Sequence, residues 1–206
     1  MTYEEWTSVE KIKRYKENRY KTIDQKLIDR REKSIVDNIF YNFKITGSIL
    51  DIPCGYGRFH QILNAYGDVY AADKYQLIVQ YQEEELGIVK STKVCTADSI
   101  PYPDNFFNVV FCLRLMQHIH DSNERVKIYK ELNRVSKEWV IVSLYTNTVL
   151  HSTIKRINRK KAKITFLQSA QVQKEFTESN LKPIYSKSVI PRIHGQKICL
   201  TKKIFN

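Results

Sequence analysis

The sequence predicts an α/β fold, a three-layer α-β-α sandwich built on a mostly parallel sheet of seven strands. Between residues 46 and 145, short apolar runs alternate with amphipathic helical patterns. That alternation predicts parallel strands joined by right-handed crossovers. Near the end of the chain, two strand-like runs separated by a short loop predict an antiparallel hairpin at one edge. Together these patterns favour a sheet covered by helices on both faces.

At 206 residues, 42% of them hydrophobic, the chain is long enough to bury a full core without disulfide bonds. No repeat interrupts the sequence, so we expect one domain over residues 1–206. Within it, residues 1–45 are expected to form N-terminal helices that cap the sheet. Residues 46–145 form the predicted ligand-binding core, 146–167 a basic insertion, and 168–206 the final helix and hairpin.

The N-terminal segment shows helical spacing of its apolar residues. They recur every third position at Trp6, Val9 and Ile12, and every fourth position at Ile35, Ile39 and Phe43. Charged residues fill the remaining positions, as expected for helices with one packed face. We expect a break between two helices near residues 24–31, although no glycine or proline marks it.

The stretch from Ile49 to Phe59 holds the strongest local signal. An apolar run leads into Asp51, Gly55 and Gly57 follow, and an amphipathic pattern then starts. This order predicts a strand, a tight turn and a helix. Glycine in the turn permits backbone conformations that a Cβ forbids, and it lets a ligand approach the main chain closely. Because the following helix directs its first amides at the same crevice, we expect a small molecule there.

Acids close three of the apolar runs in this half of the chain. Asp51 lies at the end of the first run, Asp73 ends the run 69–73, and Asp98 ends the run 94–98. Ligands of parallel sheets bind outside the carboxyl ends of the strands, so the three acids are predicted to share one rim. A strand-end acid can also simply cap the next helix. The occurrence of all three beside the glycines favours a binding site.

The later elements follow the same alternation. A continuous apolar run over residues 106–113 predicts a strand that is covered on both faces. Asp121 or Ser122 is expected to cap the next helix. The remaining predicted elements are a strand over 139–145, a helix over 169–181, and strands over 184–190 and 197–200.

The cysteines lack the spacing of a metal site or a redox motif. They are Cys54, Cys95, Cys112 and Cys199. Buried free thiols are therefore favoured, and no metal is expected. No apolar run approaches the ~20 residues that span a bilayer, and the N-terminus has no signal-peptide core. We expect a cytoplasmic location, with peripheral association at the inner face of the membrane as a second option.

Taken together, these residues resemble the class I S-adenosylmethionine-dependent methyltransferases, in particular the type 11 domains. The resemblance covers residues 46–145 and implies their Rossmann-like sheet. The segment 50–58 is similar to the first motif of the family, which lies against the methionine part of the cofactor. S-adenosylmethionine is therefore the implied cofactor and S-adenosylhomocysteine the implied product.

The same resemblance implies individual roles. In the family, the acid matching Asp73 holds the ribose hydroxyls, and the acid matching Asp98 lies at the adenine amino group, with Ser99 or Ile100 beside the ring. The residues implied to bind the cofactor are Asp51, Pro53, Cys54, Gly55, Gly57, Arg58, Asp73, Lys74, Asp98, Ser99, Ile100, Cys112 and Leu113.

A dinucleotide site would use the same rim, and its fingerprint has three glycines in the pattern GxGxxG. Here His60 stands at the third glycine position, and we expect it to be too bulky for close contact between helix and strand. Pro53 departs from the methyltransferase pattern, where many relatives carry glycine. It stiffens the turn but leaves Gly55 and Gly57 in place, so the methyl-donor reading is favoured.

Charge distribution is the main clue to the acceptor. The net charge is +12, and from residue 145 onward 13 Lys and Arg face only two acids. Residues 151–163 contain six of these cations and follow the fifth predicted strand, whose end faces the rim. This charge favours an anionic acceptor, which would be a small molecule, a glycan or a lipid-linked group. It also favours contact with an anionic membrane, and nucleic acid is less favoured. A solvated loop is the alternative. Candidate acceptor-binding residues are Tyr15, Tyr20, Tyr145, Lys155, Arg156 and Arg159.

The expected reaction is in-line displacement of the methyl group, which requires mainly placement of the acceptor and exclusion of water. His118 is a candidate general base, or an ordinary packed histidine. Residues 112–115 read Cys-Leu-Arg-Leu in place of the Asn-Pro-Pro-Tyr motif that marks amino-group methylation in the family, so O-methylation is favoured. Residues 139–191 also resemble small bacterial methyltransferases of cell-envelope polysaccharide assembly. The alternatives are a non-catalytic scaffold with this fold, or an RNA-binding or RNA-modifying protein.

Overall fold

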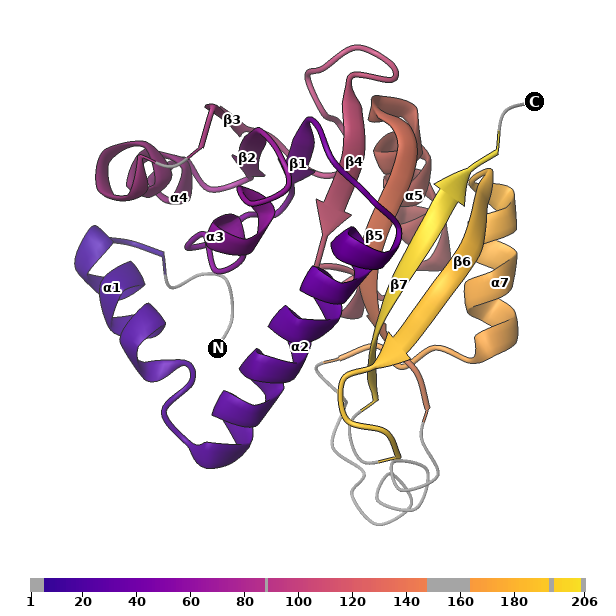
Figure 1. Cartoon of the computed structure of the whole chain (residues 1–206), viewed down its shortest axis with the longest axis horizontal. Helices are drawn as coiled ribbons and strands as arrows, with labels where there is room; N and C mark the ends of the chain where they lie inside the picture. Colours follow the sequence, from indigo (N-terminus) through magenta and orange to yellow (C-terminus); the bar gives the residue numbers. More distant parts are fainter. Residues whose placement is uncertain (1–5, 88, 148–163, 193–194, 205–206) are drawn as a thin grey trace.

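The computed structural model describes residues 6–87, 89–147, 164–192 and 195–204. Seven strands form one sheet in the order β3-β2-β1-β4-β5-β7-β6 (Figure 1). The first five strands are parallel, and β7 lies antiparallel between β5 and β6. The strands are β1 Ile49–Asp51, β2 Val69–Asp73, β3 Ser91–Val94, β4 Phe107–Cys112, β5 Ser136–Tyr145, β6 Leu181–Ser188 and β7 Gln196–Lys203.

Helices precede, connect and follow these strands. The α-helices are α1 Val9–Asn18, α2 Ile23–Asn42, α3 His60–Leu63, α4 Gln76–Tyr81, α5 Ser122–Val135 and α7 Ser169–Glu178. A π-helical turn, η2 Gln82–Leu86, extends α4, and a 3-10 turn, η3 Met116–His118, follows β4. Asp121 is the cap of α5, because its carboxylate accepts hydrogen bonds from the Asn123 and Glu124 amides.

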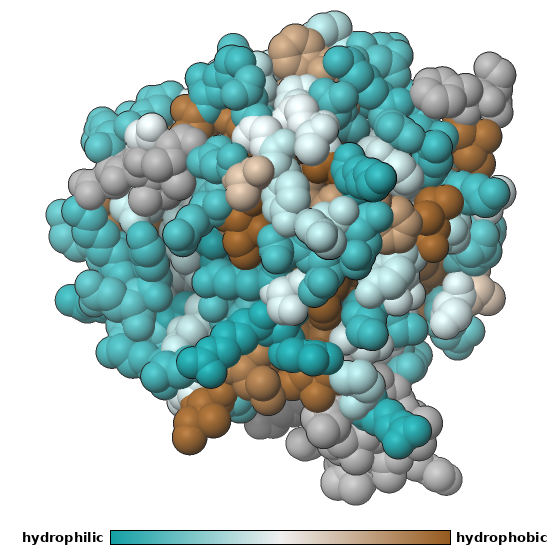
Figure 2. Space-filling model, viewed as in Figure 1, coloured by the Kyte–Doolittle hydropathy of each residue, from teal (hydrophilic) through white to brown (hydrophobic). Residues whose placement is uncertain are grey.

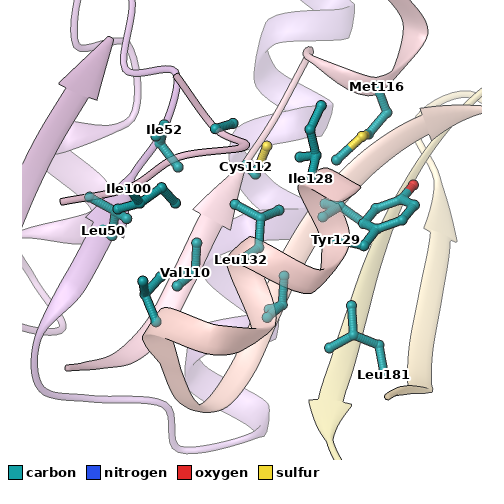
Figure 3. Close-up of a cluster of buried hydrophobic side chains, with 14 of the residues drawn as sticks. Leu50, Ile52, Ile100, Val110, Cys112, Met116, Ile128, Tyr129, Leu132 and Leu181 are labelled. Atoms are coloured by element: carbon teal, nitrogen blue, oxygen red, sulfur yellow. The ribbon is translucent and has the colours of Figure 1, made fainter. Parts of the chain in front are cut away.

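Two apolar cores lie on opposite faces of the sheet, which confirms the three-layer arrangement. On one face, Leu50 and Val110 pack against Tyr129 and Leu132 of α5 (Figure 3). On the other face, neighbouring strand residues such as Ile49 pack against α2 and α3. Successive strand residues point to opposite faces of a sheet, so the continuous apolar runs of β1 and β4 supply both cores.

A third, smaller cluster lies at the left of the sheet in Figure 1, where α1 approaches α4. Ile12 of α1 is fully buried there against Cys54 and Ile78. Tyr15 of α1 makes an edge-on ring contact with Tyr56, at a centroid distance of 5.9 Å. The N-terminal helix therefore covers the segment between Cys54 and Gly57.

Three predicted boundaries were wrong, for identifiable reasons. The break between the first helices lies at residues 19–22, because Thr22 is extended and α2 starts at Ile23. The last helix ends at Glu178, since Asn180 adopts a positive φ of 53° and β6 starts at Leu181. The third strand is Ser91–Val94, earlier than expected, and it lies at an edge of the sheet. Edge strands need no continuous apolar run, so the pattern did not reveal it.

Within the described ranges, no helix is both long and apolar enough to cross a bilayer. The four cysteines are free thiols, three of them buried and Cys95 partly exposed. Among these same residues no group of three or more potential ligands is placed to hold a metal ion.

Candidate cofactor and acceptor site

The turn after β1, residues 53–58, is called the glycine turn here. Gly55 and Gly57 adopt φ values of 52° and 74°, a region that side chains strongly disfavour. A Cβ built on Gly55 would meet no atom within 4 Å. The main chain at Gly55 therefore borders open space, as needed for close approach of a ligand.

Asp73, at the end of β2, holds the glycine turn in place. Its two carboxylate oxygens accept hydrogen bonds from the Gly55 and Tyr75 amides, each at 3.1 Å. The residue is only 4% exposed, and burial raises the pKa of its carboxyl, against the effect of these two amides. Each oxygen retains capacity for a further donor. Asp73 can thus bind ligand hydroxyls while it orders the turn.

Asp51, at the end of β1, is paired with a buried histidine. Its Oδ2 lies 3.0 Å from Nε2 of His60, and both side chains are almost fully buried. Burial raises the pKa of Asp51, while the hydrogen bond with His60 opposes that shift. His60, which stands at the third glycine position of the dinucleotide pattern, is thus fully buried, and its ring is engaged by the strand-end acid.

A surface hollow of about 420 Å³ lies beside the ends of β2 and β3. Its lining residues are Lys74, Val94, Cys95, Thr96, Ser99 and Pro101. Two of these, Lys74 and Ser99, are among the residues implied to bind the cofactor. The hollow therefore lies along the carboxyl edge of the sheet, at the segment that directly follows Asp73.

Asp98 lies four residues beyond the end of β3, in a turn closed by the Ser99 amide and the Thr96 carbonyl. Its position at a strand end was therefore mispredicted. Lys127 of α5 donates to Asp98 at 2.7 Å, and that hydrogen bond lowers the pKa of the carboxyl. The side chain is 35% exposed. Asp98 is thus near the hollow but already neutralised by a surface lysine.

The Arg58 guanidinium, implied to bind the cofactor, points instead to the N-terminal helices. It donates to Glu32 of α2 and to the Tyr20 hydroxyl, and its Nε lies 2.9 Å from Asp29. Arg114, just after β4, also donates to Glu32, at 3.1 and 2.8 Å. Arg58 therefore ties the glycine turn to α2.

Glu32 is fully buried and also accepts a hydrogen bond from Gln196 of β7. We call Glu32, Arg58, Arg114 and Gln196 the Glu32 cluster. Burial alone would raise the pKa of Glu32, but Arg58 and Arg114 outweigh it and lower the pKa. Sequence reasoning missed this residue. The available signal was an acid on the apolar face of α2, four residues after Ile28 and three before Ile35.

The remaining residues that the resemblance implies for the cofactor are mostly buried. Pro53 belongs to the turn itself, and Cys54, Ile100, Cys112 and Leu113 are buried. The Ile100 amide donates to Glu131 at 2.7 Å, which fixes the loop beside Asp98. Burial raises the pKa of the Cys54 and Cys112 thiols, so both remain protonated at neutral pH.

Two candidate acceptor residues, Tyr20 and Tyr145, lie around the Glu32 cluster, whereas Tyr15 packs against Tyr56 of the glycine turn. The Tyr145 hydroxyl donates to Gln196 at 3.3 Å, and Tyr20 contacts Arg58. Burial raises the pKa of both phenols, so they are neutral donors at pH 7. His118 lies in η3, and burial lowers its pKa, with further contributions from His120 and Arg114. Lys155, Arg156 and Arg159 lie outside the described residues.

Both described ends of the basic insertion meet at this side of the sheet. Thr146 pairs with Leu167 in an isolated bridge, and the Leu167 amide donates to the Tyr145 carbonyl at 2.8 Å. The Thr165 amide donates to the Gln117 carbonyl of η3, also at 2.8 Å. The insertion therefore leaves and returns beside Tyr145 and His118.

Comparison with known proteins adds to this geometry. Residues 50–142 match the model of a methyltransferase domain family. This segment, which is less than half of the chain, is similar to methyltransferase domains. It contains the glycine turn, Asp73 and the hollow beside β3, and its match ends within β5.

Two curated relatives match only part of this chain. A ubiquinone/menaquinone biosynthesis C-methyltransferase from Burkholderia mallei is 30% identical over 106 residues, which are 47% of this chain and 41% of that protein. An uncharacterised protein of Methanocaldococcus jannaschii is 24% identical over 90 residues, 43% of this chain and 36% of its own. The chain thus matches less than half the length of these relatives.

Solved structures share the fold over most of the chain. Magnesium protoporphyrin IX methyltransferase from Synechocystis, crystallised with S-adenosylhomocysteine, superposes with a TM-score of 0.72 and 17% identity over 89% of this chain and 88% of its own. An S-adenosylmethionine-dependent methyltransferase from Clostridium acetobutylicum superposes with a TM-score of 0.70 and 13% identity, over 93% of this chain and 96% of its own. At these identities the comparison shows the fold alone.

Proposed function

We propose that this protein transfers a methyl group from S-adenosylmethionine to a small-molecule, glycan or lipid-linked acceptor, with oxygen as the favoured acceptor atom. One observation carries the proposal. Gly55 presents its main chain to open space beside a buried carboxylate, Asp73, that retains free acceptor capacity. Such a pair fits a nucleoside ligand whose ribose supplies two hydroxyl donors.

The chain's own residues fit the cofactor. Asp73 would accept the ribose hydroxyls, and the hollow lined by Lys74 and Ser99 would receive the base, with Asp98 at its edge. Gly55 and Gly57 would bring the main chain against the methionine part. When bound, S-adenosylmethionine supplies a methyl group on a sulfonium, which is already activated for displacement.

The acceptor is expected between the Glu32 cluster, η3 and the end of β5. The charges of Arg58 and Arg114 are balanced by Glu32 and Asp29, so the preference for an anionic acceptor rests on the six Lys and Arg of residues 151–163. Tyr20 and Tyr145 would orient the acceptor through neutral hydroxyls. His118, whose lowered pKa keeps it neutral at pH 7, would take the proton from an acceptor hydroxyl. The remaining contribution is placement in line with the methyl group and exclusion of water.

Transfer of labelled methyl groups into fractionated cell extract tests the proposal. We expect label in the envelope-glycolipid or small-molecule fraction with the native protein, and none with Asp73→Ala. Mass spectrometry of the labelled product then locates the methyl group on oxygen or elsewhere. Label confined to RNA or protein would refute the acceptor class. Absence of label from every fraction, together with no cofactor binding, would favour the non-catalytic scaffold.

His118→Ala and His120→Ala form a matched pair for the proposed base. Both histidines lie after β4, but only His118 is assigned to the acceptor. We expect His118→Ala to reduce turnover and to remove the acidic limb of the pH profile, while His120→Ala leaves turnover unchanged and only moves that limb to higher pH, because His120 helps to lower the pKa of His118. Equal effects of the two substitutions would contradict a proton-accepting role for His118.

A further inference from the structure

The corner between α1 and α2, residues 19–30, exposes two aliphatic side chains together. Ile23 is 88% exposed and Leu27 is 48% exposed. They lie four residues apart in the first turns of α2, hence on one helix face. Figure 2 shows apolar surface at the corner where α1 and α2 meet in Figure 1. We call this surface the α1–α2 tip.

Cations surround the two aliphatic side chains. Lys26 and Arg30 follow Ile23 by three and seven residues, so they share its helix face. Lys21 lies two residues before Ile23, where α2 starts. All three side chains are exposed. Over residues 11–31 the chain has nine Lys and Arg against three acids. The tip is therefore strongly basic, although the charge averaged over residues 1–144 is nearly zero.

Two acids of this helix face the other way, whereas Asp24 in its first turn is exposed. Asp29 and Glu32 lie on the packed side of α2, where they are engaged by Arg58, Lys33 and Arg114. Their charge is thus used inside the protein, and the outer face of the first turns of α2 retains its cations. The fold separates charge across this helix and leaves the positive side next to exposed Ile23 and Leu27.

We infer that the α1–α2 tip docks on an anionic membrane surface. Exposed aliphatic side chains ringed by Lys and Arg suit the boundary between headgroups and acyl chains, because the apolar atoms enter the acyl region while the cations meet lipid phosphates. Long basic side chains reach the headgroups without being buried. A protein partner would need a larger apolar area than two side chains supply.

The position of the tip gives docking a consequence for the site. Tyr20, three residues before Ile23, contacts Arg58 of the glycine turn. A membrane-docked tip therefore places the acceptor side of the molecule close to the lipid surface. The inference goes beyond the proposed transferase activity and is measured without it, so either can fail alone.

Co-sedimentation with vesicles tests the inference. We expect the full chain to bind vesicles of phosphatidylglycerol and phosphatidylcholine, and to bind pure phosphatidylcholine at least about tenfold more weakly. Ile23→Asp/Leu27→Asp should reduce binding to the anionic vesicles by about tenfold or more. The matched control is Ile184→Asp/Ile204→Asp, since these side chains are 39% and 41% exposed elsewhere; it should bind as the native protein does.

Two double variants that each remove two positive charges complete the design. Lys21→Gln/Lys26→Gln should weaken binding and reduce its salt dependence more than Lys182→Gln/Lys187→Gln, which removes the same charge from β6. Circular dichroism and cofactor titration verify that each variant is folded. The inference would be overturned if the native chain did not bind anionic vesicles, or if Ile23→Asp/Leu27→Asp bound them equally well. So would a tip substitution that changes oligomeric state and not vesicle binding.

Discussion

Two buried acidic regions lie near the same edge of the sheet, and the protein treats them in opposite ways. In the cofactor half, burial raises the pKa of Asp51 and Asp73, which have only a histidine and backbone amides as partners. In the acceptor half, two guanidiniums hold the pKa of Glu32 below its ordinary value. Burial thus outweighs the favourable contacts of the Asp51 and Asp73 carboxylates, whereas two guanidiniums outweigh the burial of Glu32.

The difference separates carboxylates suited to ligand binding from a carboxylate that stabilises the fold. A desolvated carboxylate with remaining acceptor capacity gains from a ligand that brings hydroxyl donors or positive charge. A carboxylate that already holds two guanidiniums has little to offer a ligand and contributes to stability instead. Asp73 is thus suited to hold a cofactor. Glu32 is suited to fix α2 against the glycine turn, β4 and β7.

The largest expected effect is on stability. Glu32→Gln leaves the Arg114 guanidinium without its counter-charge and Arg58 with Asp29 alone, and it should lower the free energy of unfolding by about 3 kcal/mol or more. Chemical denaturation measures it. Glu138→Gln is the control, because its pair with Lys202 has both side chains 45% exposed and should contribute less than about 1 kcal/mol. Equal losses would show that the Glu32 cluster is not a structural centre.

The same variant predicts a change in pH dependence. The folded-state pKa of Glu32 is lowered, so its contribution to stability is present above the ordinary value of 4.5 and is lost as pH falls through the folded-state value. The native protein should therefore lose stability on acidification below about pH 4.5. Glu32→Gln should lose less over that range, and parallel pH profiles would contradict the assignment.

Asp73→Ala should act on binding more than on stability. It removes charge-assisted hydrogen bonds, each worth about 1.5–3 kcal/mol, so the Kd for S-adenosylhomocysteine should rise about 100-fold. Asp68→Ala is the control, because Asp68 is an exposed acid paired with Lys90 at the opposite end of β2. If Asp73→Ala destabilised the fold as much as Glu32→Gln, the contrast between the two regions would fail.

Gly55→Ala and Gly87→Ala sharpen the contrast further. Both glycines have positive φ, 52° and 55°, and a Cβ on either would meet no atom within 4 Å. Each substitution should lower stability by about 1 kcal/mol. Only Gly55→Ala should also weaken S-adenosylhomocysteine binding, by about tenfold, because its Cβ would occupy the ligand's space. Similar affinities of the two variants would remove the glycine turn from the site.

Asp98→Ala is expected to have the smallest effect. Its side chain is 35% exposed and bonded to Lys127, so we expect cofactor affinity to fall only about threefold. Asp104→Ala, which breaks another exposed pair, should leave affinity unchanged. A loss as large as that of Asp73→Ala would mean that the ligand displaces Lys127.

The sequence predicted the parts of this molecule that depend on local pattern. The alternation of apolar runs located β1, β2, β4 and β5, and glycine chemistry located the turn. It misplaced β3, because an edge strand with one exposed face has no continuous apolar signature. It therefore also set Asp98 at a strand end that lies four residues earlier.

The Glu32 cluster depends on long-range contacts that no local pattern encodes. Glu32 lies 82 residues from Arg114 and 164 from Gln196 along the chain. For the same reason, the Arg58 guanidinium was placed toward the methionine moiety of the cofactor, whereas acids from α2 bind it. Averaging charge over 144 residues likewise concealed the basic α1–α2 tip.

Calorimetric titration with S-adenosylhomocysteine tests the central claim most directly, when the native protein, Asp73→Ala and Glu32→Gln are compared at a temperature where all three are folded. The account predicts clear binding by the native protein, a loss of about 100-fold in Asp73→Ala, and little change in Glu32→Gln. Absence of binding by the native protein, or equal losses in the two variants, would contradict it.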